Sequence, residues 1–217
     1  MIMETPEMSK YQVSLEIAGS TAIWTRPDTG DAPTSYQVPT RSAVKGVFES
    51  ILWLPTAVVV PTRVEVCAPI VYHTYTTNYG GPLRKSGTAN FQLIATVLIN
   101  VCYRFYADLR PFDGPSDRLP ASARAWLGTN CPHAYQEMFE KRLQRGQWAR
   151  TPCLGWQEFV PEYLGPVRPG KTQVQEDLNF VLPSMLEFVF PRQNDSARAP
   201  VFRQNVKITK GVLIYAP

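Results

Sequence analysis

Hydrophobic and polar residues alternate near the start of the chain and then change to a helical spacing. The alternation over residues 11–17 predicts a strand, which Gly19 ends. Residues 25–39 hold prolines and a glycine and predict a loop. Apolar side chains then recur at the i, i+3, i+4, i+7 spacing of a helix with one buried face. These side chains are Val44, Val47, Phe48 and Ile51. We therefore predict a helix over residues 42–54 that stops at Pro55.

β-branched and aromatic residues dominate the middle of the chain. Residues 57–60 and 63–70 predict two short strands on this basis. Residues 72–87 are rich in turn-forming residues and predict the tip of a long hairpin. Residues 91–109 form a long β-branched and aromatic run, which favours strands over a helix.

A second helix is predicted after a loop over residues 111–120. Asn130 caps it, Pro132 lies in its first turn and Gly146 ends it. Its predicted buried stripe consists of Tyr135, Met138, Phe139 and Leu143. The rest of the chain is punctuated by prolines and glycines, and it contains short β-like pieces, among them residues 185–190 and 212–215.

This order of elements is typical of one fold class. Strand, helix, strand, hairpin, strand, helix and strand suit an α+β sheet of the ferredoxin-like (RRM-like) type with a β-rich tail. We predict a ferredoxin-like domain with a long β-hairpin and a basic helix over residues 1–150, and a β-rich C-terminal extension over residues 151–217.

Composition narrows the functional classes. No stretch approaches 18 consecutive apolar residues, and residues 1–10 lack an apolar run, so we expect a cytoplasmic protein with no membrane partner. The four cysteines show no C-x-x-C spacing and the chain has two histidines, which argues against a metal site. We expect no cofactor, and we expect the cysteines to be reduced thiols in the core or on the surface.

The net charge of +4 is weak evidence for a polyanionic binding partner, but the distribution of the basic residues is more informative. Four basic residues and no acid occur between Lys141 and Arg150, interleaved with Trp148. Arg84 and Lys85 form a second basic cluster close to an aromatic residue, Tyr79. Basic groups beside aromatic rings suit single-stranded RNA, because they offer charge for phosphates and flat faces for unstacked bases. Ordinary surface charge is the alternative interpretation of each cluster.

The start of the first helix is a further candidate site. Thr40 or Ser42 can cap its free backbone N–H groups, and Arg41 and Lys45 project from the same turn. Backbone N–H groups and cations together suit a phosphate. A solvated lysine and arginine on an amphipathic helix is the simpler interpretation of this segment taken alone.

Five segments together resemble one protein family. They are Val13-Ser-Leu-Glu-Ile-Ala-Gly19, Trp24-Thr-Arg-Pro27, Val38-Pro-Thr-Arg-Ser-Ala-Val-Lys-Gly-Val-Phe-Glu-Ser50, Arg142-Leu-Gln-Arg-Gly146 with Leu154-Gly-Trp-Gln-Glu-Phe159, and Pro200-Val-Phe-Arg203. In this order they resemble the CRISPR-associated Cas-five family of the RAMP superfamily, in its type I-C (Dvulg) subtype.

The resemblance implies a subunit of the Cascade surveillance complex. Such a subunit holds the 5′ handle of the crRNA, abuts the backbone and large subunits, and lies near target DNA at the PAM-proximal end. In this subtype it also cuts precursor crRNA within the repeat. The implied cut is metal-independent: the 2′-OH of the RNA attacks the adjacent phosphate and leaves a 2′,3′-cyclic phosphate.

The chain departs from the family at the residues that would catalyse this cut. Members carry a tyrosine before the tryptophan that ends the first helix and a Lys-His pair at the start of the later helix. Here those positions fall on Leu52 and on Ala134-Tyr135. His133 lies one to two residues upstream of the pair. Since histidine is the side chain best suited to proton transfer near neutral pH, we predict His133 as acid or base.

The remaining candidates follow from the same reaction and from RNA binding. Lys141 or Lys45 would stabilise the charge on the phosphorane, and Tyr135 is a further catalytic candidate, although its apolar neighbours favour a core role. The predicted RNA-binding residues are Trp24, Arg26, Arg41, Lys45, His73, Tyr79, Arg84, Lys85, Arg142, Arg145, Trp148 and Arg150.

Two alternatives stay open at this point. The first is a structural cap that binds the crRNA 5′ end and its protein neighbours but does not cut. The absence of the family's catalytic trio, the tyrosine and the Lys-His pair, supports this alternative. The second is an α+β protein-interaction domain that binds no nucleic acid.

Overall fold

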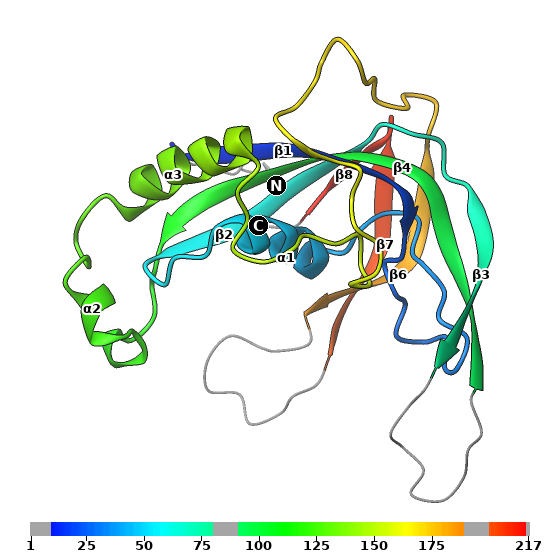
Figure 1. Ribbon diagram of the computed structural model, residues 1–217, viewed down its shortest axis with the longest axis horizontal. Coiled ribbons are helices and arrows are strands. Elements are labelled where there is room, and N and C mark those ends of the chain that lie inside the picture. The colour runs from blue at the N-terminus through cyan, green and yellow to red at the C-terminus, as the bar shows by residue number, and fades with distance from the viewer. Residues whose placement is uncertain (1–9, 80–90, 189–199, 216–217) are drawn as a thin grey trace, which may run out of the picture.

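A twisted antiparallel sheet with helices on one face forms the framework of the protein (Figure 1). The computed structural model describes residues 10–79, 91–188 and 200–215. The strands occur in the order β5-β1-β4-β2-β8-β7-β6, and β3 pairs with β4 outside this path. The mixed α+β architecture fits the predicted ferredoxin-like class.

The strands have the following bounds. They are β1 Gln12–Ala22, β2 Ala57–Val66, β3 Tyr72–Tyr79, β4 Phe91–Pro111, β5 Tyr163–Gly165, β6 Phe180–Phe188, β7 Val201–Thr209 and β8 Val212–Ile214. The long strand β4 pairs with β3 along its first half and with β1 and β2 along its second half. The predicted hairpin and the predicted β structure of residues 91–109 are therefore confirmed, while the predicted tip residues 80–87 lie outside the described residues.

Several strand boundaries differ from the prediction. β1 continues past Gly19 to Ala22 because it stays paired with β4 along that whole length. The two strands predicted over residues 57–60 and 63–70 are one strand, β2, with an irregularity between Pro61 and Arg63. The strand β7 was not predicted, because only two of its nine side chains are buried and its sequence shows little alternation.

The first helix, α1 (Arg41–Ile51), forms as its spacing predicts. Thr40 caps it, with its hydroxyl accepting a hydrogen bond from the Ala43 backbone N–H at 3.3 Å. All four predicted apolar side chains are buried. The helix ends three residues before the predicted end, because the backbone at Leu52 is extended and the side chain of Leu52 turns into the core.

The later helix, α3 (Cys131–Arg145), follows a short helix, α2 (Ala121–Arg124), and a single 3₁₀ turn over Ser116–Arg118. Gly146 ends α3 in the left-handed conformation that glycine adopts without strain. The prediction that Met138 is buried was wrong, since this side chain is 41% exposed. The buried positions of α3 recur every four residues from Cys131, and Met138 falls beside that stripe.

The two longer helices pack on the same hydrophobic core. The rings of Phe48 on α1 and Phe139 on α3 lie 5.5 Å apart between their centroids. The guanidinium group of Arg142 on α3 donates to the Ile51 carbonyl at the end of α1, at 3.0 Å. These contacts fix the end of α1 against α3 over the hydrophobic core.

The C-terminal part of the chain extends the same sheet. β5 pairs with β1, and β8 pairs with β2, so segments on both sides of residue 150 contribute neighbouring strands. The division into residues 1–150 and 151–217 stays a prediction. Among the described residues, no helix is long and apolar enough to cross a membrane.

A buried charged network ties the segment after β5 to the opposite face of the sheet. Glu16 lies between Leu15 and Ile17, two core residues, so its side chain points away from the helices. It is fully buried and accepts hydrogen bonds from Arg168 and Thr172. Arg104 of β4 joins the network through the Thr172 hydroxyl at 2.8 Å. The network fixes residues 168–172 against β1 and β4.

Candidate functional site

The start of α3 presents a histidine beside a tyrosine. The side chain of His133 is 53% exposed, and its ring centroid lies 5.6 Å from that of Tyr11, the residue before β1. The Asn130 side chain does not cap the helix as predicted. Instead its amide donates a hydrogen bond to the Tyr11 hydroxyl at 2.6 Å. The start of β1 therefore positions the imidazole of His133 at the surface.

One carboxylate links His133 to Lys141. Glu137 lies 3.4 Å from the Nε2 atom of His133 through its Oε1 atom, and 3.4 Å from the Nζ atom of Lys141 through its Oε2 atom. The three residues are spaced four apart, so they form one exposed stripe along α3. More than half of each side chain is accessible. The structure thus brings together two of the three predicted catalytic residues.

Tyr135, the third predicted catalytic residue, is fully buried. Its hydroxyl donates a hydrogen bond to the Leu52 carbonyl at 2.5 Å. Burial raises the pKa of Tyr135 well above its ordinary value, so the phenol stays protonated. A buried phenol bonded to a backbone carbonyl holds the two helices together and does not reach a ligand at the surface. We leave Tyr135 out of the candidate site.

The positions that correspond to the family's catalytic trio do lie together in space. The hydrogen bond from Tyr135 to Leu52 joins two of them directly. Both side chains belong to the hydrophobic core, and Ala134 between His133 and Tyr135 carries no ionisable group. At this place the chain has core packing, where the resemblance to the family implied proton carriers.

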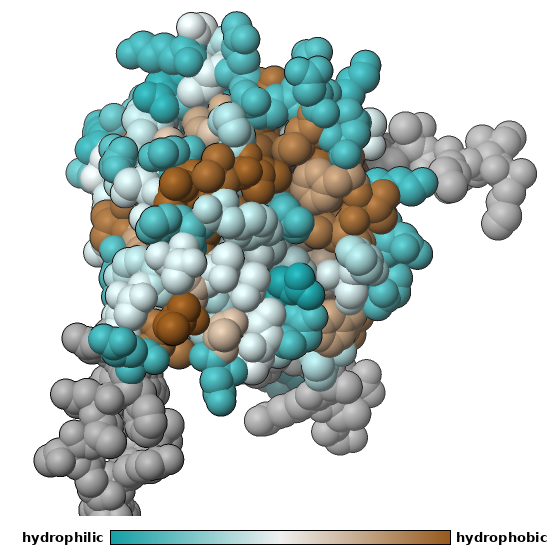
Figure 2. All heavy atoms as spheres, turned by 90° about the vertical axis from the view of Figure 1, so that its right-hand side faces the viewer, coloured by the Kyte–Doolittle hydropathy of each residue, from teal (hydrophilic) through white to brown (hydrophobic). Residues whose placement is uncertain are grey.

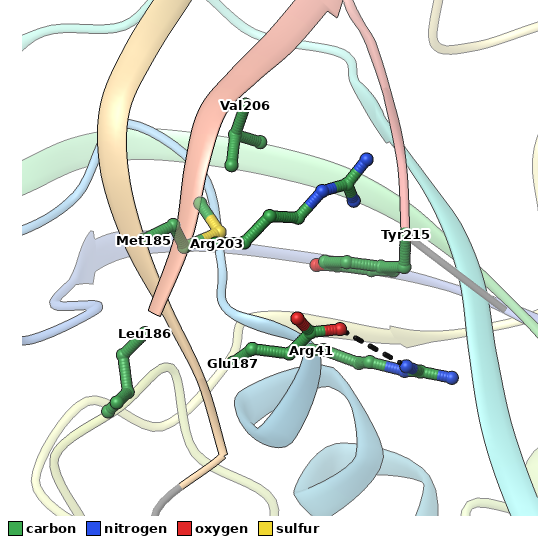
Figure 3. A pocket seen from close by; sticks show the side chains of 7 residues that line it. All are labelled: Arg41, Met185, Leu186, Glu187, Arg203, Val206 and Tyr215. Atoms are coloured by element: carbon green, nitrogen blue, oxygen red, sulfur yellow. Dashed lines mark hydrogen bonds and ion pairs between the residues drawn. The ribbon is translucent and has the colours of Figure 1, made fainter. Parts of the chain in front are cut away.

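Arg41 connects α1 to the C-terminal strands and does not point freely to solvent (Figure 3). Its Nη1 atom lies 3.3 Å from Oε1 of Glu187 on β6, and both side chains are mostly buried. Tyr215 packs above this pair, and its hydroxyl donates to the Pro39 carbonyl at 2.7 Å. The cavity beside them, of about 10 Å³, is no larger than one water molecule. The structure therefore gives Arg41 a tethering role at the start of α1.

Lys45, in contrast, lies on the accessible side of α1. Its amino group is 3.5 Å from Glu49, and its side chain is 41% exposed. An exposed pair of this kind contributes at most about 1 kcal/mol, so a phosphate can replace the carboxylate. The segment after α3 comes close to the end of α1, because the backbone N–H groups of Ala149 and Arg150 both donate to the Ser50 carbonyl at 2.9 Å.

This contact attaches the segment that carries Arg145, Trp148 and Arg150 to the end of the helix that carries Lys45. Arg145, Trp148 and Arg150 are all exposed and follow one another from the end of α3. Arg142 is partly buried and bonded to α1, so it acts mainly in packing. We call the exposed set of Lys45, Arg145, Trp148 and Arg150 the basic surface.

The other predicted RNA-binding residues lie elsewhere or are enclosed. Trp24 is 2% exposed and its ring N–H donates to Tyr103, so the prediction that it stacks on a base does not fit its burial. Arg26 pairs with Asp28 at 2.7 Å in the loop before α1. His73 is exposed on β3. The side chain of Tyr79, and Arg84 and Lys85, lie outside the described residues.

Sequence reasoning missed Tyr11 and the bridging role of Glu137. The spacing of Glu137 from His133 and Lys141 was visible in the sequence as two i, i+4 pairs. The proximity of Tyr11 to His133 was not, because it depends on how the start of β1 meets α3, 122 residues later in the chain. Exposed Trp53 after α1 was also missed.

No metal centre is apparent in the part of the chain that the structure describes. There, no group of three or more His, Cys, Asp or Glu side chains converges. The four cysteines carry free thiols, and Cys67, Cys102 and Cys131 are buried.

Comparisons with known proteins agree on one family. A sequence profile for the Cas5d group of CRISPR-associated Cas5 proteins matches residues 13–178. A Thermus thermophilus protein named CRISPR pre-crRNA endoribonuclease Cas5d is 30% identical over 162 residues, which cover 71% of this chain and 64% of that protein. A Mannheimia succiniciproducens protein of the same name is 27% identical over 171 residues, which cover 70% of this chain and 71% of that protein.

Two solved structures share the fold. One is described as a CRISPR-associated protein and has a TM-score of 0.68 at 19% identity, covering 96% of this chain and 93% of that one. The other, an uncharacterised protein from Streptococcus mutans, has a TM-score of 0.67 at 20% identity, with the same coverage.

Proposed function

Since the chain belongs to the CRISPR-associated Cas5 family, we propose that it cuts precursor crRNA within the repeat and then holds the crRNA 5′ handle. The observation that carries this proposal is the exposed stripe of His133, Glu137 and Lys141, which lies on the same helix as the start of the basic surface. The names of both curated relatives support an endoribonuclease activity.

The stripe on α3 supplies groups suited to RNA cleavage by internal attack. In this reaction the 2′-oxygen loses its proton and bonds to the adjacent phosphorus, the bond from phosphorus to the 5′-oxygen breaks, and that oxygen gains a proton. We assign His133 to one of the two proton transfers, and Tyr11, whose ring lies beside it, offers a hydroxyl as a second proton carrier. The ammonium group of Lys141 stabilises the negative charge that accumulates on the phosphate oxygens.

The basic surface provides the path for the RNA backbone. Lys45 and Arg150 lie on adjoining segments, and Trp148 offers an exposed ring on which a base can stack. The Cascade backbone and large subunits are the protein partners that we propose. Figure 2 shows apolar groups gathered on the side of the molecule that carries β3, and exposed apolar residues on nearby strands include Tyr72, Ile94 and Val181. This side is separate from α3 (Figure 1) and suits protein contacts.

A structural cap that binds the 5′ handle without cutting is the second candidate. The burial of Leu52 and Tyr135 favours it, because the trio positions carry no accessible proton carrier. In that case the basic surface would still bind RNA, and another protein would process the precursor.

Incubation of the purified protein with the cognate repeat RNA in EDTA tests the proposal. We expect one cut within the repeat and a 5′ fragment that ends in a 2′,3′-cyclic phosphate, which phosphatase removes only after acid opening of the ring. Tight binding without cutting would establish the structural cap instead. Cutting that requires a divalent cation would contradict the proposed mechanism.

A further inference from the structure

Two cysteines lie opposite each other at the root of the hairpin that β3 and β4 form. Cys67 follows the last residue of β2, and its backbone N–H donates to the carbonyl of Cys102 on β4 at 2.8 Å. This bond continues by one residue the antiparallel pairing of Val66 with Tyr103. Hydrogen-bonded residues opposite each other in such a pair have Cα atoms about 5.5 Å apart. That separation lies inside the range of roughly 4.4–6.8 Å that a disulfide spans.

Both thiols lie on the face of the sheet that carries the charged network around Glu16. Val66 and Tyr103 belong to the hydrophobic core, so the residues next to them along each strand point to the other face. The two thiol groups are close enough there to shift each other's pKa. Both are free, and each residue is 9% exposed, which admits a molecule as small as hydrogen peroxide but not a second protein.

The surroundings make Cys102 the more reactive of the two thiols. Its pKa lies below the ordinary value, chiefly because of the neighbouring Cys67 thiol, while burial opposes this shift and the charges of Arg168 and Arg104 add to it. The same contact raises the pKa of Cys67. Since the thiolate is the form that reacts with an oxidant, Cys102 is the attacking sulfur and Cys67 is the partner that completes the bond.

We propose that Cys67 and Cys102 are an oxidation site, at which hydrogen peroxide converts two thiols into a reversible disulfide. The Cys102 sulfur attacks one peroxide oxygen, the O–O bond breaks, and a sulfenic acid forms while the other oxygen leaves as water with the Cys102 proton. The Cys67 sulfur then bonds to the Cys102 sulfur, the S–O bond breaks, and a second water leaves with the Cys67 proton. The pair is oxidised by two electrons, and the peroxide is reduced to two molecules of water.

The disulfide staples the place where the hairpin leaves the main sheet. β4 pairs with β3 as far as Leu98 and with β2 from Tyr103 onward, and the strand bends between these two parts (Figure 1). Asn100, within the bend, has a φ of 54°, a left-handed conformation that is uncommon for a residue other than glycine. A bond between Cys67 and Cys102 encloses the whole hairpin in one covalent loop. Such a cross-link raises stability by restricting the unfolded chain.

Peptide mapping after mild oxidation tests the proposal directly. The protein is treated with hydrogen peroxide in its folded state, and its remaining thiols are blocked with iodoacetamide before it is denatured and digested with trypsin. Cleavage at lysine and arginine puts Cys67 in the peptide of residues 64–84 and Cys102 in the peptide of residues 86–104, apart from the other two cysteines. Cys67→Ala removes the pair, and Cys131→Ala is the matched control because it removes a buried thiol elsewhere. Thermal unfolding is followed before and after oxidation.

We expect wild type and Cys131→Ala to yield the two peptides joined by a disulfide that dithiothreitol reverses. Their unfolding midpoints should rise on oxidation by about 5 °C or more. Cys67→Ala should yield no such link and no rise. If folded wild type yields no link between these peptides, or links Cys131 or Cys153 instead, the oxidation site is wrong, whether or not Cys67→Ala folds. A link without a rise in the unfolding midpoint would overturn the stapling of the hairpin root.

Discussion

Adjacent candidates in the sequence have different roles because burial separates them. Arg41 and Lys45 both looked like phosphate ligands at the start of α1, yet Arg41 pairs with Glu187 inside the molecule and Lys45 projects to the surface. In the same way His133 is exposed while Tyr135, two residues later, is enclosed. The sequence showed the residue types, but only the packing of the C-terminal strands and of α1 shows which of them can touch a ligand.

Substitution of these two cations separates binding from stability. Lys45→Ala should weaken RNA binding and lower the slope of log affinity against log salt concentration by about 0.7, because one phosphate contact is lost. Its unfolding free energy should change by less than about 1 kcal/mol. Arg41→Ala should instead destabilise the fold, since it leaves Glu187 without this partner in a mostly buried setting. Unchanged RNA affinity and salt slope in Lys45→Ala would remove Lys45 from the basic surface.

At the scale of elements, features set by local sequence patterns were predicted correctly, whereas features set by tertiary packing were not. The buried face of α1 and the β structure of β4 follow from spacing and residue type. Met138 was wrongly predicted to be buried because Met138 and Phe139 both fit the helical spacing from Tyr135, at i+3 and i+4. Packing against the sheet buries Phe139 and leaves Met138 exposed. The strand β7 was missed because pairing with β6 and β8, rather than its own pattern, makes it a strand.

The network around Glu16 makes the attachment of residues 168–172 dependent on pH. Burial alone would raise the pKa of Glu16, but hydrogen bonds from Arg168 and Thr172 outweigh it and lower the pKa below the ordinary value of 4.5. A carboxyl with a lowered pKa contributes stability that is fully present above about pH 4.5 and is lost as the pH falls further.

Glu16→Gln should therefore reduce the unfolding free energy at pH 7 by about 3 kcal/mol, because it leaves buried arginine charge without its partner. It should also flatten the loss of stability below pH 4.5 that wild type shows. Chemical denaturation between pH 3 and pH 7 measures both effects, with the exposed Glu162→Gln as the control. A variant with the same acid dependence as wild type would show that the network does not govern it.

At the scale of the whole molecule, one sheet and one core include both predicted parts of the chain. Leu154 and Leu213, from beyond residue 150, are fully buried in the same cluster as Leu15 and Phe48. The strands β5 and β8 also cover edges that β1 and β2 would otherwise leave unpaired. The described residues beyond residue 150 are therefore part of what holds α1 and α3 in place.

A fragment of residues 1–150 should accordingly fail to unfold cooperatively, while the whole chain should show a single cooperative transition. The expected cause is the exposure of apolar side chains that β5 and β8 cover. Circular dichroism during urea titration makes the comparison. A cooperative transition in the fragment would establish residues 1–150 as an independent domain, as the sequence pattern suggested.

The most direct test of the account is single-turnover cleavage of repeat RNA by wild type, His133→Ala and Tyr135→Phe at saturating protein concentration. We predict that His133→Ala cuts about 10²- to 10⁴-fold more slowly with unchanged RNA affinity, because it lacks a proton carrier. Tyr135→Phe should cut at the wild-type rate, since its hydroxyl only bonds the Leu52 carbonyl. Full activity in His133→Ala, or its loss in a folded Tyr135→Phe, would contradict the assignment of the active site to the exposed stripe of α3.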